Sequence, residues 1–279
     1  MTHRASALIS AQEWFSAGER VGYDAERPGI NPRSPLRAFI RRAAGTGVTR
    51  TFLPGWPDGS YGWAKVEAFL SSRFHFPRIY LDYIGHGDSD KPRDYPYSTF
   101  ERADLVEALW HAEGIAQTVV VAFDYSCIVS LELLARRIDR ERAGNDQRTR
   151  ITACLLAPFL RPVFSRGYPL SAAEMKELHD AISRRDGVRV LPATAGFVDE
   201  HREHAARWDL ARIISALGDE VAFGVVGSAE DPFEGEQLRL ARERLADSVE
   251  ITELAGGHLT TAEQPDRLAE VIAALPERS

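Results

Sequence analysis

The stretch TVVVAFDYSCIVSLELL, residues 118–134, constrains the fold more than any other part of the chain. Three consecutive valines predict a buried strand, and apolar residues three and four positions apart in the second half predict a helix. Asp124 stands at the junction. The small residues Ala122 and Ser126 lie two positions before and after it, where strand and helix backbones come closest. This layout predicts a nucleophile elbow that presents Asp124, and the simpler alternative is a junction whose Asp caps the helix.

Strand and helix patterns alternate through the first half of the chain. After two short antiparallel edge strands, around Glu13–Phe15 and Leu36–Ile40, further strands are predicted at 50–53, 79–83 and 151–158. The predicted helices between them cover 60–72, 98–112 and the residues from 126 up to the polar run 136–150, which predicts a solvated loop. This alternation predicts a mostly parallel sheet with helices on both faces, and ligands bind at the carboxyl edge of such sheets.

Residues 159–214 interrupt the alternation. A proline-rich start precedes predicted helices at 171–183 and at about 194–214, and no strand is predicted between them. Strands and helices alternate again after this segment. We therefore predict an α/β core domain, 1–158 and 215–279, with a helical cap inserted over the sheet edge.

The composition excludes some classes of function. The chain of 279 residues can bury a large core, as one α/β domain or as two smaller ones, and it is 44% hydrophobic and 27% charged. Its net charge of -7 is unfavourable for binding a nucleic acid or an anionic membrane. We expect a small-molecule substrate, no nucleic-acid or membrane partner, and a monomer or homodimer.

The two cysteines, Cys127 and Cys154, both lie in apolar runs. They are expected to be small buried hydrophobic residues, without disulfide or metal-ligand spacing. The chain has no long uninterrupted apolar segment, and its first residues lack the apolar region of a signal peptide. A cytoplasmic location is the resulting expectation.

Three polar residues follow three predicted buried strands: Asp124, Asp231 and His258. In a parallel sheet all three belong at one edge, in the order nucleophile, acid, base. A carboxylate can attack an electrophilic carbon to form an ester, and a histidine held by an acid can then activate water against that ester. Taken singly, Asp231 before a proline could begin a turn and His258 after two glycines could be a loop residue.

Five motifs in order resemble the α/β-hydrolase superfamily, in the branch of haloalkane dehalogenases and epoxide hydrolases. They are LPGWPDGSYGW, DYIGHGDSDKP, AFDYSC, GSAEDPF and GGHLTTAEQPD. The resemblance covers the chain from Thr49 to Leu275 and implies the α/β-hydrolase fold with a helical cap. From Asp124 onward the chain is most similar to the mesoderm-specific-transcript-like group, which also has a cap segment like SAAEMKELHDAISRRDG.

The resemblance implies a role for each matching residue. Asp124 matches the nucleophile, Asp231 the acid and His258 the base. The backbone N–H groups of Trp56 and Tyr125 match the two donors of the oxyanion hole. The cap would wall in the substrate and exclude water, and neither a metal nor another cofactor is implied.

The chain also departs from the family pattern around the elbow. Pro54 and Phe123 stand where the family has histidines, and Ala122 and Ser126 stand where it has glycines. These replacements predict a tight, strained elbow. They also make any transfer of substrate specificity from the family unsafe.

The leaving group distinguishes the two reactions of this branch. Epoxide opening requires an acid, normally a pair of cap tyrosines, and the predicted cap contains only Tyr168, so that Tyr61 or Tyr95 would have to complete the pair. Halide departure requires N–H donors, and this chain has Tyr125 where dehalogenases commonly have Trp, although Trp56 offers an indole. We favour an epoxide hydrolase slightly over a haloalkane dehalogenase, acting on a small organic substrate through a covalent ester on the nucleophile.

Several aromatic residues are candidates for substrate binding. They are Trp56, Tyr125, Tyr168, Phe197 and Trp208. On the second predicted cap helix, His201 and His204 could bind a metal, but a solvated polar helix face is the simpler interpretation. A turn position accounts for His86.

Other hypotheses remain open on the same fold. The altered elbow is compatible with a lyase, isomerase or cyclase of a specialised pathway, and a capped cavity is compatible with a non-catalytic ligand-binding protein. An esterase that uses Ser126 is a poor alternative, because this residue falls on the helix side of the turn.

Overall fold

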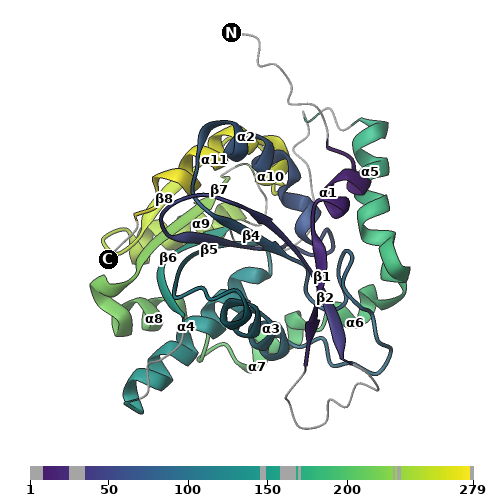
Figure 1. The fold of residues 1–279 in the computed structure, drawn as a ribbon. Helices are drawn as coiled ribbons and strands as arrows, with labels where there is room; N and C mark the ends of the chain where they lie inside the picture. The colour runs from purple at the N-terminus through teal and green to yellow at the C-terminus, as the bar shows by residue number, and fades with distance from the viewer. Residues whose placement is uncertain are drawn as a thin grey trace.

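The computed structural model describes residues 9–24, 35–144, 149–157, 168, 171–228, 230 and 234–276. Over these residues eight strands form one sheet in the order β1-β2-β4-β3-β5-β6-β7-β8 (Figure 1). The strands are β1 (Glu19–Tyr23), β2 (Leu36–Ala43), β3 (Thr49–Leu53), β4 (Arg78–Leu81), β5 (Gln117–Phe123), β6 (Arg150–Ala157), β7 (Ala222–Gly227) and β8 (Glu250–Glu253). The strand pairs from β4 to β8 are parallel, whereas β1 and β2 are antiparallel to their neighbours.

Helices cover both faces of the sheet, as the alternating pattern predicts (Figure 1). The helices are α1 (Ala11–Ser16), α2 (Ala64–Arg73), α3 (Thr99–Ala112), α4 (Ser126–Arg142), α5 (Ala172–Ser183), α6 (Leu191–Thr194), α7 (Phe197–Glu203), α8 (Leu210–Leu217), α9 (Glu234–Leu245), α10 (Thr260–Glu263) and α11 (Pro265–Ala274). Three 3-10 turns join them: η1 (Ser60–Trp63), η2 (Arg184–Val190) and η3 (Gly218–Glu220).

The core consists of two apolar layers separated by the sheet. On β5, Val120 and Ala122 belong to the layer under α3 and α4, whereas Val119, Val121 and Phe123 belong to the layer under α2 and α11. A strand buried on both faces has a continuous apolar sequence instead of an alternating one. This arrangement explains the valine run that precedes Asp124.

The predicted strand at Glu13–Phe15 is wrong, because these residues lie in helix α1. Ser10 accepts a hydrogen bond from the Glu13 N–H, and the Glu13 carboxylate accepts one from the Ser10 N–H, a complete capping box. Ala11, Trp14 and Phe15 are buried at helical spacing. The edge strand is β1, which begins after this helix and pairs with β2.

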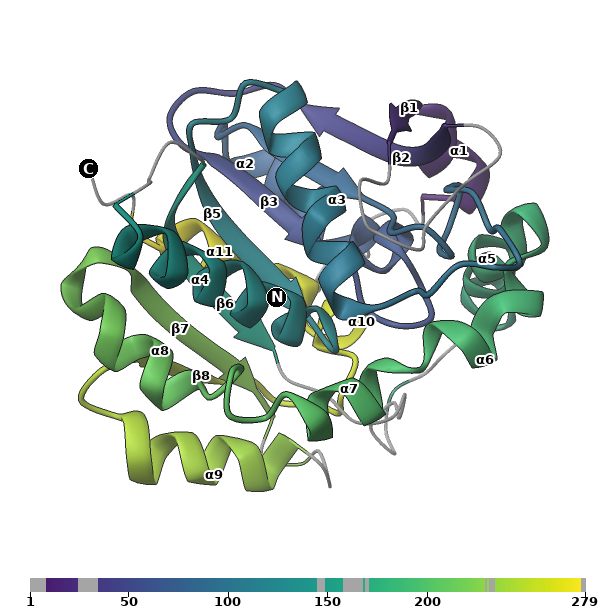
Figure 2. The same cartoon turned by 90° about the horizontal axis from the view of Figure 1, so that it is seen from below.

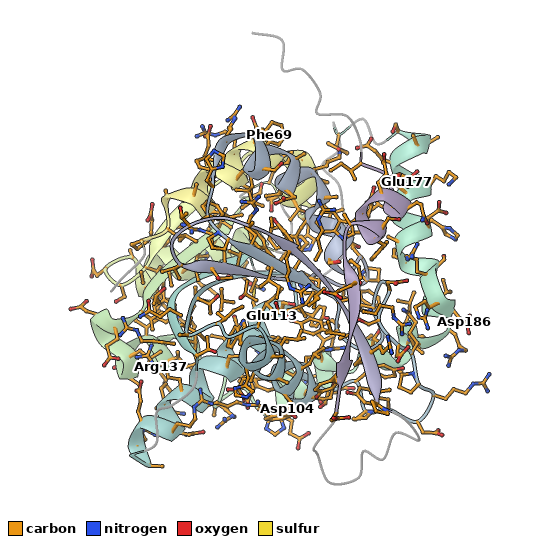
Figure 3. The ribbon with its side chains drawn as sticks, in the orientation of Figure 1. Phe69, Asp104, Glu113, Arg137, Glu177 and Asp186 are labelled. Carbon is orange, nitrogen blue, oxygen red and sulfur yellow. The ribbon has the colours of Figure 1, made fainter. Side chains whose placement is uncertain are left out.

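The predicted loop at 136–150 is wrong over its first half, because α4 continues to Arg142. Arg136 bonds Glu132 one turn earlier and Glu107 on α3. Arg137, labelled in Figure 3, bonds Glu141 one turn later. Ion pairs at this spacing support a helix, and the partly buried ones also dock α4 onto α3.

The segment from residue 171 to residue 217, which we call the helical insertion, contains only helices and turns. Its first helix, α5, is capped by Ser171 and matches the predicted helix. The single helix predicted at about 194–214 is wrong, because the chain forms α6, α7 and α8 with breaks at Ala195–Gly196 and before Asp209. Asp209 caps α8 by accepting the Arg212 N–H.

Helices α6 and α7 of the helical insertion lie at the carboxyl edge of the sheet, whereas α8 packs against α4. Figure 2 shows α6 and α7 beyond the arrowheads of β5 and β7. None of the helices in the described parts of the chain has the length and apolar character needed to cross a bilayer.

Candidate active site

Asp124 lies at the turn between β5 and α4 in a strained conformation. Its φ of 62° places it in the left-handed region, which costs a non-glycine residue about 1–3 kcal/mol. The packed strand and helix on either side hold this conformation. The carboxyl group is only 2% exposed, at the carboxyl edge of the sheet.

The residues around the turn fit one another closely. A Cβ atom on Gly55 would lie 2.6 Å from the Phe123 ring and 3.1 Å from Asp124 Cβ, so only glycine is tolerated there. The Ser126 hydroxyl donates to the Pro54 carbonyl and lies 2.9 Å from the Tyr83 hydroxyl. Ser126 is therefore buried and ties the loop before Trp56 to the elbow, which makes it unsuitable as a nucleophile.

Two backbone N–H groups bind the carboxylate of Asp124. The Tyr125 N–H donates to Oδ1, and the Trp56 N–H also donates to the carboxylate. These are the two donors expected for an oxyanion hole. In this structure they already hold an oxygen of Asp124 itself.

His258 faces the other carboxylate oxygen. Its Nε2 lies 3.5 Å from Asp124 Oδ2, and the ring is 1% exposed and packs on Phe123. Burial raises the pKa of Asp124 to about 6, although His258 and the two N–H groups limit the rise. Asp124 is therefore ionised at neutral pH. The predicted acid, Asp231, lies outside the described residues.

A second carboxyl group, Asp58, was missed in the sequence. It stands in the loop closed by a bridge between Gly55 and Gly59, directly after Pro57. Burial and the charge of Asp124 raise the pKa of Asp58 to about 7, and His258 opposes the rise. The position of Asp58 only two residues after Trp56 could have identified it.

Asp58 lines a small cavity of about 40 Å³. The residues just after His258 form one wall, and Lys65 and Glu174 form another. A cavity of this size holds about one water molecule. The structure therefore brings a water-sized space and a titrating carboxyl group next to His258.

A larger cavity of about 380 Å³ opens on the other side of Asp124. Its wall is formed by the elbow, β7, α7, α8 and α9 and is mostly apolar, with polar side chains contributed by Asp124, His201, Asp209, Gln237 and Arg244. Phe197 of α7 stacks on the Tyr125 ring at 4.8 Å, and both line the cavity. Apolar walls around a few polar groups are typical of small-molecule sites.

Comparisons with known proteins agree with this architecture. Residues 52–271 match the model of the Alpha/beta hydrolase family. The chain belongs to this family. It is 27% identical to Putative hydrolase LipZ of Mycobacterium tuberculosis (strain ATCC 25618 / H37Rv), over 95% of this chain and 98% of that protein.

Two further proteins are similar to this chain. The human mesoderm-specific transcript homolog protein is 32% identical over 56% of this chain and 57% of its own length. The crystal structure of the haloalkane dehalogenase DatA from Agrobacterium tumefaciens C58 superposes with a TM-score of 0.66 at 17% identity, covering 92% of this chain and 96% of that one. The protein is a hydrolase of the alpha/beta type.

Two of the five predicted substrate-binding residues of this hydrolase line the large cavity, namely Tyr125 and Phe197. Trp56 lies next to Phe197, with ring centroids 6.4 Å apart, but does not form the wall. The Trp208 indole donates to Glu132 on α4, and the Tyr168 hydroxyl contacts Lys65 and Glu174 near the small cavity. Neither Trp208 nor Tyr168 lines the large cavity.

The hydrolase has eight tyrosines, all within the described residues, and Tyr125 is the one that lines the large cavity. Its hydroxyl lies 3.5 Å from His86 Nε2. The Tyr61 hydroxyl donates to the Ile9 carbonyl and the Tyr95 hydroxyl to Glu101. The expected pair of acidic tyrosines is therefore not assembled from Tyr168 with either core residue.

The predicted solvated polar face is confirmed for His201, which is exposed on α7, whereas His204, directly after this helix, is only partly exposed. His201 lines the large cavity and His204 packs edge-on against Phe100 at 4.9 Å. Among the described residues, no group of three or more His, Cys, Asp or Glu side chains is placed to hold a metal ion.

Proposed function

We propose that this hydrolase attacks a saturated carbon of a small, mainly apolar substrate and forms an alkyl ester on Asp124. One observation carries the proposal: the N–H groups of Tyr125 and Trp56 hold the carboxylate of Asp124, the first at Oδ1, and Oδ2 is turned towards His258. A substrate carbonyl would need the same two donors. The site therefore favours an electrophile without a carbonyl, such as an epoxide or a haloalkane, over an ester.

The proposed reaction with an epoxide has two steps. Oδ2 of Asp124 forms a bond to an epoxide carbon as the C–O bond of the ring breaks, and the released oxygen takes up a proton that a side-chain donor relays from solvent. His258 then removes a proton from water, and the resulting hydroxide adds to the ester carbonyl, whose oxygen is held by the N–H groups of Trp56 and Tyr125. Collapse expels the alcohol oxygen, which takes the proton from His258 and gives a diol. The carboxylic acid left on Asp124 then loses its proton to solvent, which restores the carboxylate.

A panel of epoxides, haloalkanes, lactones and carboxylic esters tests this proposal on the wild-type protein. We expect turnover of epoxides first and haloalkanes second, with lactones and esters inert. Turnover of simple esters alone would contradict it. Tight binding of the panel compounds without any turnover would favour a non-catalytic ligand-binding protein.

The side-chain donors favour an epoxide over a haloalkane. The Trp56 indole N–H donates to Thr194 Oγ1 at 3.0 Å, so it is not directed at a halide in the cavity. In place of the tyrosine pair, His201 offers a donor at the cavity wall, one helical turn after Phe197. Burial lowers the pKa of His201, so the neutral ring is the main form at pH 7 and retains one N–H.

Replacement of His201 by glutamine should slow ester formation from an epoxide by about 100-fold, the usual contribution of a general acid. Ester formation from a haloalkane, which needs no proton, should change little. Rapid-quench mass measurement of the adduct checks both, with His204→Gln as the matched control because His204 packs on Phe100 outside the cavity. An equal effect on the two substrates would contradict the proposed role of His201 as proton donor to the epoxide oxygen.

Asp58 is proposed to stabilise the imidazolium of His258 during ester hydrolysis. The charged and titratable groups facing it are Asp124, His258, Lys65 and Glu174. Asp124 is neutral in the ester, so ionisation of Asp58 leaves one carboxylate beside the histidine as it gains a proton. In the free enzyme the pKa of Asp58 is about 7, raised by burial and by the charge of Asp124. Formation of the ester removes that charge and lowers this pKa, so the stabilisation is present at pH 7 and above and is lost as the pH falls below 7.

In Asp58→Asn, decay of the ester should therefore no longer accelerate between about pH 5 and pH 8, and near pH 8 it should be about tenfold slower than in wild type. The measurement is the ester lifetime after rapid quenching across this pH range. Glu174→Gln, on the opposite wall of the same small cavity, should keep the wild-type pH profile. A wild-type profile in Asp58→Asn would contradict the assignment.

A further inference from the structure

We propose that Thr194 of α6 is a positioning residue that holds both oxyanion-hole residues, Trp56 and Tyr125, against the helical insertion. The inference rests on the proposed function, since it assigns these two residues a role in ester hydrolysis. It adds a condition that the family resemblance does not imply. The two donors of the oxyanion hole are aligned only while the helical insertion is packed against them.

The contact with Trp56 is direct. The Trp56 indole N–H donates to Thr194 Oγ1 at 3.0 Å, and the Thr194 hydroxyl donates in turn to the Leu191 carbonyl at 3.0 Å. Thr194 is wholly buried, so water does not compete for either bond. The side chain of Trp56 is thereby fixed to α6, while its backbone N–H binds Asp124.

The contact with Tyr125 passes through Arg102. Arg102 Nη2 donates to the Thr194 carbonyl at 2.7 Å, and the guanidinium lies 4.6 Å from the centre of the Tyr125 ring. Arg102 is wholly buried, and within the described residues its Nε and Nη1 have no hydrogen-bond partner. Burial of a cation is costly, so its contacts with one carbonyl and the aromatic rings of Tyr125 and Tyr83 are its main compensation.

The side chain of Thr194 is tightly packed between the helical insertion and the core. A Cβ atom on Gly85, whose φ is 102°, would lie 2.7 Å from the Thr194 methyl carbon. The loop after β4 therefore packs directly on the threonine. Phe197, three residues after Thr194, stacks on the ring of Tyr125, the other oxyanion-hole residue. Displacement of α6 would disturb both aromatic residues at once.

Thr194 is expected to affect catalysis by aligning the donors of the oxyanion hole. Oxyanion-hole donors are effective only within normal hydrogen-bond distance of the developing charge, and loss of one costs about 100-fold or more. In the proposed reaction this charge develops when water attacks the ester. Loosening Thr194 should therefore slow ester hydrolysis more than ester formation.

The test compares Thr194→Val with Thr194→Ser. Valine keeps the shape but loses both hydroxyl bonds, whereas serine keeps the hydroxyl. In Thr194→Val we expect ester hydrolysis to slow by about 10- to 100-fold, with ester formation within about threefold of wild type. Thr194→Ser should restore at least most of the hydrolysis rate, which a purely structural role of the methyl group would not predict.

A second readout does not depend on the substrate. The indole N–H resonance of Trp56, assigned by its loss in Trp56→Phe, should shift and exchange faster in Thr194→Val and remain close to wild type in Thr194→Ser. If no ester forms in the wild type but this resonance responds as expected, the proposed function fails and the contact of Thr194 with Trp56 stands. An unchanged resonance, or Thr194→Ser as slow as Thr194→Val, would overturn the inference.

Trp56→Phe alone covers the case in which Thr194→Val folds poorly, and the double variant tests whether the two residues act through one bond. Trp56→Phe removes the same hydrogen bond from the other side. If the bond acts as proposed, Thr194→Val combined with Trp56→Phe should hydrolyse the ester no more slowly than the slower single variant. Multiplicative effects of the two substitutions would contradict a shared role.

Discussion

Replacement of Asp124 by asparagine should abolish turnover and, at the same time, stabilise the fold near neutral pH. The amide keeps the shape of the side chain but cannot attack an electrophilic carbon, so turnover should fall by about four orders of magnitude or more, as for other covalent nucleophiles. Retained turnover would favour the alternative of a lyase, isomerase or cyclase that uses this position without covalent attack.

The stability effect follows from the raised pKa of Asp124. Burial raises this pKa from the usual 3.8 to about 6, so between these values the folded protein binds a proton that the unfolded chain has lost. The free energy of unfolding therefore falls as the pH rises through this window, by up to about 3 kcal/mol in total. Asparagine resembles the protonated acid and does not ionise, so the variant avoids this loss.

Urea denaturation of wild type and Asp124→Asn across this pH range measures the difference directly. The variant should be more stable by about 1–3 kcal/mol near pH 8, and the two proteins should converge below about pH 4. Relief of the strained left-handed φ adds nothing, because asparagine adopts the same conformation. A constant difference at every pH would contradict burial of the carboxylate as the cause.

The strand–turn–helix at 118–134 and the mostly parallel sheet follow from periodicity, because both sides of β5 are buried and α4 is amphipathic. The helix at Ala11–Ser16 was missed because Trp14 and Phe15 have strand propensity, while the capping box and the packing of Trp14 decide the local structure. Likewise, the charged start of 136–150 gives no apolar pattern, and the ion pairs that support it as helix come from within α4 and from Glu107 on α3.

Only some residues of the candidate site can be placed from the sequence. Residues that follow strands directly, such as Asp124, are placed by topology, and loop residues close to a motif, such as Trp56, are placed by the motif. Asp58 lies in the same motif as Trp56, and its burial beside Asp124 is what the sequence does not show. Thr194 has neither advantage in the sequence. Its importance depends on the helical insertion folding back over the sheet edge, which brings residues about 140 positions apart into contact.

Replacement of His258 by glutamine should arrest the reaction at the ester. Asp124 can still attack the substrate, since its carboxylate remains held by the N–H groups of Tyr125 and Trp56. Without the base, hydrolysis should slow by about 100- to 10,000-fold, so the adduct accumulates to one equivalent. Intact mass measurement identifies the adduct, and peptide mapping should place it on Asp124.

The mass of the adduct also separates the reactions that the fold allows. An epoxide adds its full mass to the protein, whereas a haloalkane adds its mass less that of the hydrogen halide. His86→Gln is the control, because His86 contacts Tyr125 behind the elbow and has no place in water activation. If His258→Gln turned over normally, or if the adduct mapped to Cys127 in the same cavity, the ester mechanism on Asp124 would be wrong.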